Sequence, residues 1–252
     1  MASPFLTTAP TLLTSWDDGS ATDPRLAELL ARYGFRGTFF ATSRPAETCA
    51  ASDADLRAIV GLGHEIGNHG FSHRAFTALP DAEILEEARR GMLRAREFSH
   101  EGAPIVAPPN GRLDRRVLQT LGAAGYLVRP APIVACRKPR AGTVEPTCQL
   151  YPHGRIRTCL HLMKRRALPE SVIAIVWLTS RSVFERLERL LEILASRPAP
   201  LHVWGHSEEI DRLRCWDEVE SLLALAQRRG YVGTTLSAYL GRTEAGYLQS
   251  LP

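Results

Sequence analysis

The sequence contains no uninterrupted apolar run of the roughly 18 residues that a membrane-spanning helix needs. Its first ten residues also lack the basic segment and the apolar stretch of roughly 7 to 15 residues that mark a secretory signal peptide. We therefore expect a cytoplasmic protein with no membrane partner.

Cysteine is scarce and follows no recognisable pattern. The five cysteines are Cys49, Cys136, Cys148, Cys159 and Cys215. Their number is odd and no two have the C-x-x-C spacing, which argues against a disulfide framework and against a zinc site made of thiolates. Reduced, structural thiols are the expectation, and they agree with a cytoplasmic location.

Neither sign of charge dominates. Lys and Arg total 31 against 27 Asp and Glu, a formal net charge of +4 at pH 7. The short basic run 164–166 is typical of a solvated surface, so the sequence gives no indication of nucleic-acid binding. With 44% hydrophobic and 23% charged residues, the 252-residue chain is expected to be globular and long enough to bury a core.

Apolar runs alternate with amphipathic helical stretches along the chain, which predicts an α/β fold with a parallel sheet. The predicted strands are 11–16, 37–41, 64–67, 104–107, 126–128 and 200–205. The predicted helices are 23–33, 53–62, 80–98, 113–121, 183–196 and 215–229. Residues 131–162 are expected to form irregular strands and loop, and 171–178 either strand or helix. We expect a single catalytic domain over 1–252, with its core at about 11–240.

Two carboxylates follow the first predicted strand directly, in the segment Trp16-Asp17-Asp18-Gly19. Ligands of parallel α/β proteins bind beyond the carboxyl ends of the strands, so this position favours chemistry. An Asp-Asp-Gly-Ser segment is also typical of an ordinary turn. The segment by itself leaves both interpretations open.

His69 and His73 are four residues apart, a spacing that in a helical turn points both imidazoles to one side. Two imidazoles and a carboxylate make a three-ligand zinc site with a position open for water. His64 precedes a predicted strand, which favours a structural role.

Two further segments follow predicted strands. In the segment Ala107-Pro-Pro-Asn-Gly111, two prolines stiffen the loop, so the N–H of Asn110 is a fixed donor for an oxyanion or part of a rigid surface turn. His206 follows strand 200–205 and is a candidate for catalysis, whereas His202 lies within the strand and is a candidate core histidine.

In this order the four segments resemble the motifs of the polysaccharide deacetylase family, the NodB-homology group of carbohydrate esterases (family four). The family motifs are T-F-D-D-G, H-[ST]-x-x-H, R-P-P-Y-G and a strand ending in L-x-H. The matching segments are 15–19, 69–73, 107–111 and 204–206. The resemblance extends from about residue 12 to residue 236.

This resemblance implies a distorted, incomplete (β/α) barrel and a single divalent metal, zinc first, with cobalt, nickel or manganese as alternatives. Asp18, His69 and His73 would bind the metal. Asp17 would act as the general base, His206 would protonate the leaving amine, and the Asn110 N–H would face the oxyanion.

The chain departs from the family motifs at several positions. Ala107 stands where the family often has an arginine that orients the base, and Arg129 is our candidate to replace it. Gly70 replaces a Ser or Thr that would brace the turn. The Asp and Trp of a fourth family motif have no clear match; Trp177 and Trp204 are candidates for the acyl pocket, with core packing as the alternative.

The resulting hypothesis is a zinc-dependent hydrolase that removes an N-acyl group, most simply acetyl, from an amino sugar or a small sugar-containing metabolite. The alternatives are the same machinery acting on a formyl group or a cyclic amide, or a catalytically silent carbohydrate-binding relative. Glu208, Glu209 and Asp211 follow His206, and we expect them, with Trp204, to orient one or two sugar rings or a polar aglycone of a small substrate.

Overall fold

The computed structural model describes residues 9–43, 50–99, 104–130, 134–135, 147–152, 175–176, 179–196 and 200–241. The strands are β1 (Thr11–Trp16), β2 (Thr38–Ala41), β3 (Glu65–Asn68), β4 (Ile105–Val106), β5 (Leu127–Val128), β6 (Val134–Ala135), β7 (Thr147–Gln149), β8 (Leu201–Gly205) and β9 (Val232–Thr234). The α-helices are α1 (Asp23–Arg32), α2 (Asp53–Gly61), α3 (Asp81–Arg96), α4 (Arg115–Ala123), α7 (Val183–Leu194), α8 (Ser207–Leu213) and α9 (Trp216–Arg228). Two short 3-10 turns are η1 (Phe76–Ala78) and η2 (Pro109–Gly111).

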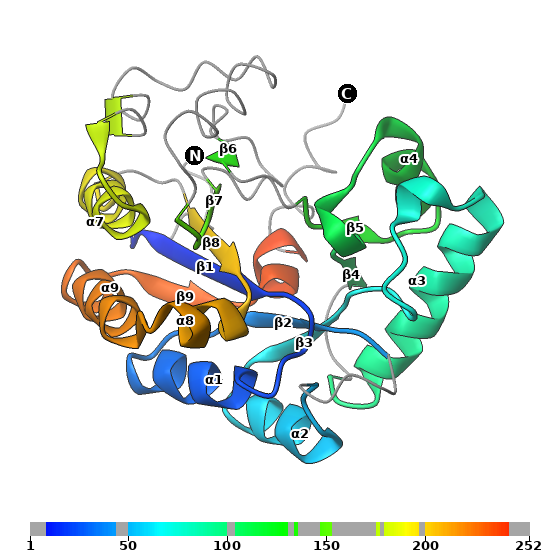
Figure 1. Ribbon diagram of the computed structural model, residues 1–252, viewed down its shortest axis with the longest axis horizontal. Coiled ribbons are helices and arrows are strands. Elements are labelled where there is room, and N and C mark those ends of the chain that lie inside the picture. Colours follow the sequence, from blue (N-terminus) through cyan, green and yellow to red (C-terminus); the bar gives the residue numbers. More distant parts are fainter. Residues whose placement is uncertain are drawn as a thin grey trace, which may run out of the picture.

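The strands form one sheet in the order β5-β4-β3-β2-β1-β8-β7-β6. Neighbouring strands are parallel except β6 and β7, which pair antiparallel. The sheet curls into a half-barrel that α1, α2, α3, α7 and α9 surround (Figure 1). This arrangement confirms the predicted α/β class and the incomplete (β/α) barrel.

β1 lies at the centre of the sheet and uses both of its edges. One edge pairs with β8 over its length, from Leu12 to Trp16. The other edge is divided, because β2 pairs with Ser15 and Trp16 while β9 pairs with residues 11–13. β9, the last strand in the described part of the chain, thus pairs with the part of β1 that β2 leaves unpaired.

Successive side chains of the central strands enter two different apolar clusters, as the two-residue period of a strand requires. Leu12 and Phe39 belong to the large cluster that includes the apolar residues of the helices. Leu13 and Phe40, their neighbours, belong to a smaller cluster with Leu236, which lies after β9. Both faces of these strands are therefore covered, which explains their continuous apolar runs.

The structure confirms each predicted strand and helix, with ends that differ by a few residues. It adds α8 and β9, which the sequence did not predict. Of the segment 131–162, residues 134–135 and 147–149 form β6 and β7. Trp177 and most of 171–178 lie outside the described residues, so the interpretation of that segment stays a prediction.

Two buried histidines serve the core, as expected. The Nδ1 atom of His64 accepts the Gly37 N–H (2.9 Å), so its Nε2 donates to the Ala27 carbonyl (2.9 Å). His202 bonds to the hydroxyls of Ser15 and Thr147 through its two ring nitrogens. In the described part of the chain, no helix is long and apolar enough to cross a membrane.

Candidate active site

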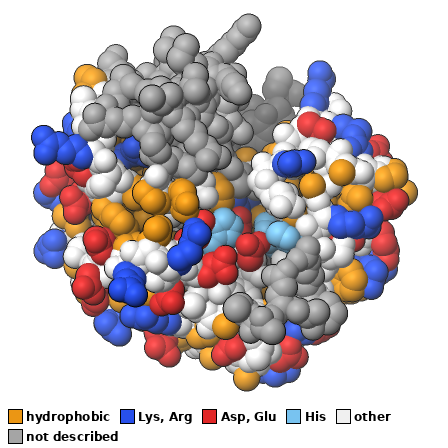
Figure 2. All heavy atoms as spheres, in the orientation of Figure 1, with side chains coloured by type: hydrophobic (Ala, Val, Ile, Leu, Met, Phe, Trp, Pro, Cys, Tyr) orange, Lys and Arg blue, Asp and Glu red, His pale blue; other side chains and the backbone are white. Residues whose placement is uncertain are grey.

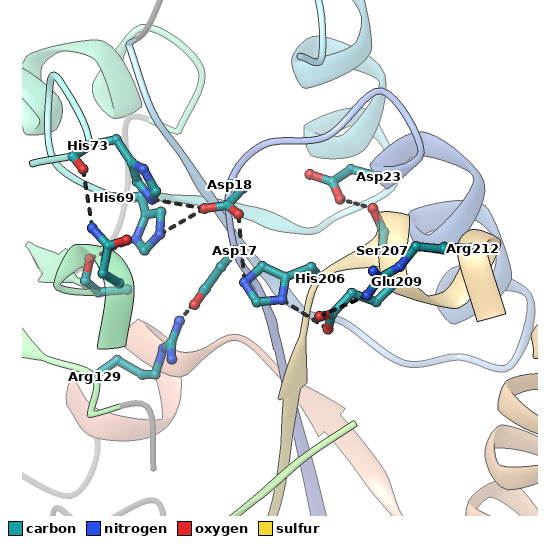
Figure 3. Close-up of polar contacts among 12 residues, drawn as sticks. Asp17, Asp18, Asp23, His69, His73, Arg129, His206, Ser207, Glu209 and Arg212 are labelled. Carbon is teal, nitrogen blue, oxygen red and sulfur yellow. Dashed lines mark hydrogen bonds and ion pairs between the residues drawn. The ribbon is translucent and has the colours of Figure 1, made fainter. Parts of the chain in front are cut away.

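The polar residues singled out by the sequence meet at one edge of the sheet. They come from the carboxyl ends of four parallel strands: Asp17 and Asp18 after β1, His69 after β3, Arg129 after β5 and His206 after β8. Figure 3 shows their side chains converging from these strands, and Figure 2 shows histidine and acidic side chains together in the middle of one face of the molecule. This is the edge where α/β folds bind ligands.

Asp18 joins the two imidazoles. Its Oδ1 atom lies 3.2 Å from Nε2 of His69 and 3.0 Å from Nε2 of His73. One ligand atom from each residue lies within 4.8 Å of those of the other two. Burial by itself would raise the pKa of Asp18, but the contacts with His69 and His73 and the charge of His206 outweigh it and hold the pKa well below its usual range.

The nitrogen atoms of this cluster fit a divalent cation. Nδ1 of His69 lies 2.8 Å from the Ala107 carbonyl oxygen, which can only accept, so Nδ1 carries the proton and Nε2 turns its lone pair to Asp18. Nε2 of His73 is buried and has no hydrogen-bond partner, although Asp18 is close. A carboxylate and two imidazole nitrogens are ligands that zinc and similar divalent ions prefer.

The two histidines do not share a helical turn, so that part of the prediction was wrong. They lie in a loop after β3 in which Gly70 and His73 have the left-handed φ values of +76° and +58°. Asp18 also has a positive φ, +78°. Backbone of this kind is costly for residues other than glycine, and it brings the imidazoles together without a helix.

Glu87 on α3 braces this loop, which the sequence analysis missed. Its Oε2 accepts the N–H groups of Phe71 (3.0 Å) and Ser72 (2.8 Å), and its Oε1 accepts the Ser72 hydroxyl (2.6 Å). Glu87 therefore supplies the brace that a hydroxyl at Gly70 would have given. The sequence does carry a signal for this role of Glu87, because an acidic residue lies on the buried side of the helix, next to Ala88 and one turn before Gly91.

Asp17 pairs with Arg129, the residue suggested as the replacement for the arginine missing at Ala107. The guanidinium Nη2 contacts Asp17 Oδ1, and both side chains are almost fully buried. The Arg129 guanidinium carbon also lies 4.8 Å from the ring centre of Phe40 and 5.2 Å from that of Trp204. The carboxylate is thus held by one nitrogen of a buried guanidinium that lies beside two aromatic rings and cannot easily move.

His206 lies on another side of Asp18. Its Nε2 is 3.6 Å from Asp18 Oδ2, and its Nδ1 is 3.0 Å from Oε2 of Glu209 on α8. Burial by itself would lower the pKa of His206, but Glu209 and the charges of Asp17 and Asp18 outweigh it and raise the pKa to about 9.

Two expectations for the substrate side need correction. Glu209 contacts His206, and Asp211 contacts Arg25 and the indole N–H of Trp216, so these carboxylates are occupied within the protein instead of being directed at a sugar.

Trp204 is 5% exposed and packs beside Arg129 and His206, so it presents little surface to a ligand.

Asn110 lies at η2 with a φ of +60°, and its side-chain amide approaches the His73 carbonyl at 3.4 Å.

A model of the family described as polysaccharide deacetylase matches residues 7–128, which include the first three motifs but not His206. A curated relative, an uncharacterized 30.6 kDa protein in the fumA 3′ region of Geobacillus stearothermophilus, is 29% identical over 103 residues. That match covers 40% of this chain and 38% of the relative, well under two thirds of its length.

Two solved structures share the fold. The chitin deacetylase from the fungal pathogen Colletotrichum lindemuthianum has a TM-score of 0.59 at 18% identity, covering 93% of this chain and 89% of that one. A CE4 family pseudoenzyme from Bacillus anthracis has a TM-score of 0.55 at 15% identity, covering 93% of this chain and 66% of that one. One fold therefore carries both a deacetylase and a pseudoenzyme, so activity has to be argued from the site.

Proposed function

Because the chain carries a polysaccharide deacetylase domain of the NodB-homology type, we propose that it is a metal-dependent N-deacetylase acting on an acylated amino sugar. The observation that supports this activity is the pairing of two proton-transfer groups beside the cluster of Asp18, His69 and His73. Asp17 is held by Arg129 and His206 by Glu209 (Figure 3).

Asp18, His69 and His73 would hold the metal, with zinc as our first choice and cobalt, nickel or manganese as alternatives. When bound, such an ion supplies Lewis-acid chemistry, since it lowers the pKa of water and polarises a carbonyl. The burial of His73 Nε2, which lies 3.0 Å from Asp18 Oδ1, supports this assignment.

Amide hydrolysis needs two proton transfers, and a different side chain beside the cluster performs each of them. Asp17 takes a proton from the water that attacks the acyl carbon, while Arg129 keeps its carboxylate oriented. The carbonyl carbon becomes tetrahedral and its oxygen becomes an oxyanion, which the Asn110 N–H would face. As the C–N bond breaks, His206 gives its Nε2 proton to the leaving nitrogen, and the products are a carboxylate and an amine.

Glu209 prepares His206 for this step. A carboxylate can only accept, so Nδ1 of His206 donates to it and Nε2 faces Asp18. Glu209 raises the pKa of His206, which favours the protonated imidazole that this step needs.

We extend the proposal to a small, soluble substrate in the cytoplasm. A cavity of about 410 Å³ begins at Asp18, a volume within the range of small-molecule sites. The free cysteines Cys148 and Cys215 are buried, which agrees with a structural role for thiols.

The test is amide hydrolysis of a panel of compounds by the purified protein, chelated and then supplied with zinc, followed as acetate or formate release or, for cyclic amides, as ring opening. The panel holds N-acetylated and N-formylated monosaccharides and disaccharides, cyclic amides, long chitin oligomers and peptidoglycan. We expect zinc-dependent hydrolysis of the small acetylated sugars. Binding without turnover would contradict the enzymatic proposal, and a specificity constant that climbs with chain length would contradict a small substrate.

A further inference from the structure

The cavity beside Asp18 extends to one side of α3. Asp18 and Gly19 line it together with residues after β2, Phe71 from the loop of the two histidines, and Arg90 and Arg94 of α3. A molecule whose acyl group lay at Asp18 would therefore have the rest of its body close to these arginines.

The charges of the α3 wall are not equivalent. Arg94 is neutralised, because it contacts both Asp53 and Glu97. Arg90 forms no ion pair with any carboxylate in the described parts of the chain, and its neighbour Glu86 is bound by both arms of Arg89. Among the described residues that line this cavity, Arg90 is thus the cation without an ion pair, the metal aside.

Arg90 is also held in place. Its guanidinium carbon lies 3.4 Å from the ring centre of Phe71, which sits between His69 and His73 in the braced loop. A guanidinium stacked on a ring keeps its edge of N–H groups available for two parallel bonds to a phosphate or carboxylate. The loop that carries the imidazoles thus also fixes a cation beside them.

We propose that the substrate carries an anionic group, a phosphate or a carboxylate, and that Arg90 binds it while the acyl group lies at Asp18. This inference rests on the proposed function, because it takes Asp18 to mark the reacting end. Arg90 is exposed, so water solvates its charge in the free protein; a bound anion would pair with that charge, whereas a neutral sugar would not.

The kinetic test compares N-acetylglucosamine with its 1-phosphate, its 6-phosphate and the corresponding uronic acid. Arg90→Gln is compared with Arg96→Gln, which removes the same charge from an exposed position of α3 that does not line the cavity. We expect Arg90→Gln to raise KM for the anionic substrates about tenfold or more, a loss of about 1.4 kcal/mol. We expect kcat, and KM for N-acetylglucosamine, to stay within about twofold, and Arg96→Gln to behave as the wild type. The KM values for the two phosphates and for the uronic acid show whether the site prefers a phosphate or a carboxylate.

Equilibrium binding of N-acetylglucosamine 6-phosphate to the zinc-loaded proteins separates this inference from the proposed function. If nothing is hydrolysed but the wild type binds the phosphate more tightly than Arg90→Gln does, the anion site stands and the deacetylase proposal fails. If the wild type treats neutral and anionic sugars alike, or if the two arginine variants behave alike, the anion site is overturned while deacetylation stands.

Discussion

The carboxylate of Asp17 and the guanidinium of Arg129 form an ion pair that solvent hardly reaches, with side chains 5% and 0% exposed. Nε and Nη1 of Arg129 have no hydrogen-bond partner in the described structure, and the rings of Phe40 and Trp204 lie near the guanidinium. Each charge is therefore compensated chiefly by the other. Neither residue can be removed without leaving a buried charge behind.

Arg129→Gln is expected to lower the free energy of unfolding by about 3 to 5 kcal/mol, the usual cost of breaking a buried pair. Urea denaturation measures it. Adding Asp17→Asn should restore part of the loss, because the double variant no longer buries a lone carboxylate. Arg116→Gln, which removes an exposed pair with Asp81, is the control and should cost about 1 kcal/mol or less. Equal losses for the two arginines would contradict this account.

Asp17→Asn should retain the metal and lower kcat by about 10² or more, the scale of losing a positioned base. The replacement is nearly isosteric but leaves the Arg129 charge unpaired, so the variant should fold with reduced stability, as circular dichroism and urea denaturation would show. Unchanged turnover, or activity and metal lost together, would show that Asp17 is not the base.

The wild type should bind one divalent ion per chain, and the double variant His69→Ala, His73→Ala should bind none, since one carboxylate remains of three ligands. Elemental analysis after dialysis against zinc measures this. Equal metal contents would show that the ion is held elsewhere.

Glu209→Gln should lower kcat about tenfold or more, with KM and metal content little changed, because His206 loses the acceptor that fixes its ring. Glu208→Gln is the matched control, since Glu208 is the exposed neighbour on α8. A rise in KM with an unchanged kcat would instead assign Glu209 to substrate binding.

The buried side chain of His64 should make the free energy of unfolding fall in acid. Burial lowers the pKa of His64 from 6.5 to about 4. Between pH 6.5 and pH 4, His64 is therefore protonated in the unfolded chain but neutral in the folded chain. Stability should fall as the pH drops from 6.5 to 4, by about 3 kcal/mol in total, and then level off for this group. In His64→Gln the fall should be smaller, so the gap between the two proteins should narrow with acid. A constant gap from pH 7 to pH 4 would refute this.

The sequence predicted the positions of most strands and helices, and with them the edge at which the site lies. The reason is that Asp17, His69 and His206 each follow a buried apolar run, and parallel strands bring their carboxyl ends together. Arg129 could be suggested on the same ground, because it follows β5.

Other contacts left little trace in the sequence. The convergence of His69 and His73 depends on left-handed backbone at Gly70 and His73, which the spacing does not reveal. Glu209 reaches His206 only because residues 207–213 form a helix of one to two turns, too short for a clear apolar period. β9 is equally short, and its place beside β1 follows from tertiary pairing alone.

The pairing of β1 with both β8 and β9 has a consequence for biosynthesis. β1, which precedes Asp17 and Asp18, leaves the ribosome long before β8 and β9, which pair with it, and before Leu236, which packs with Leu13. Until then that strand has an unpaired edge and exposed apolar side chains. We expect the nascent chain to need protection from aggregation, and Asp17 and Asp18 to be fixed in place only after β8 and β9 have been synthesised.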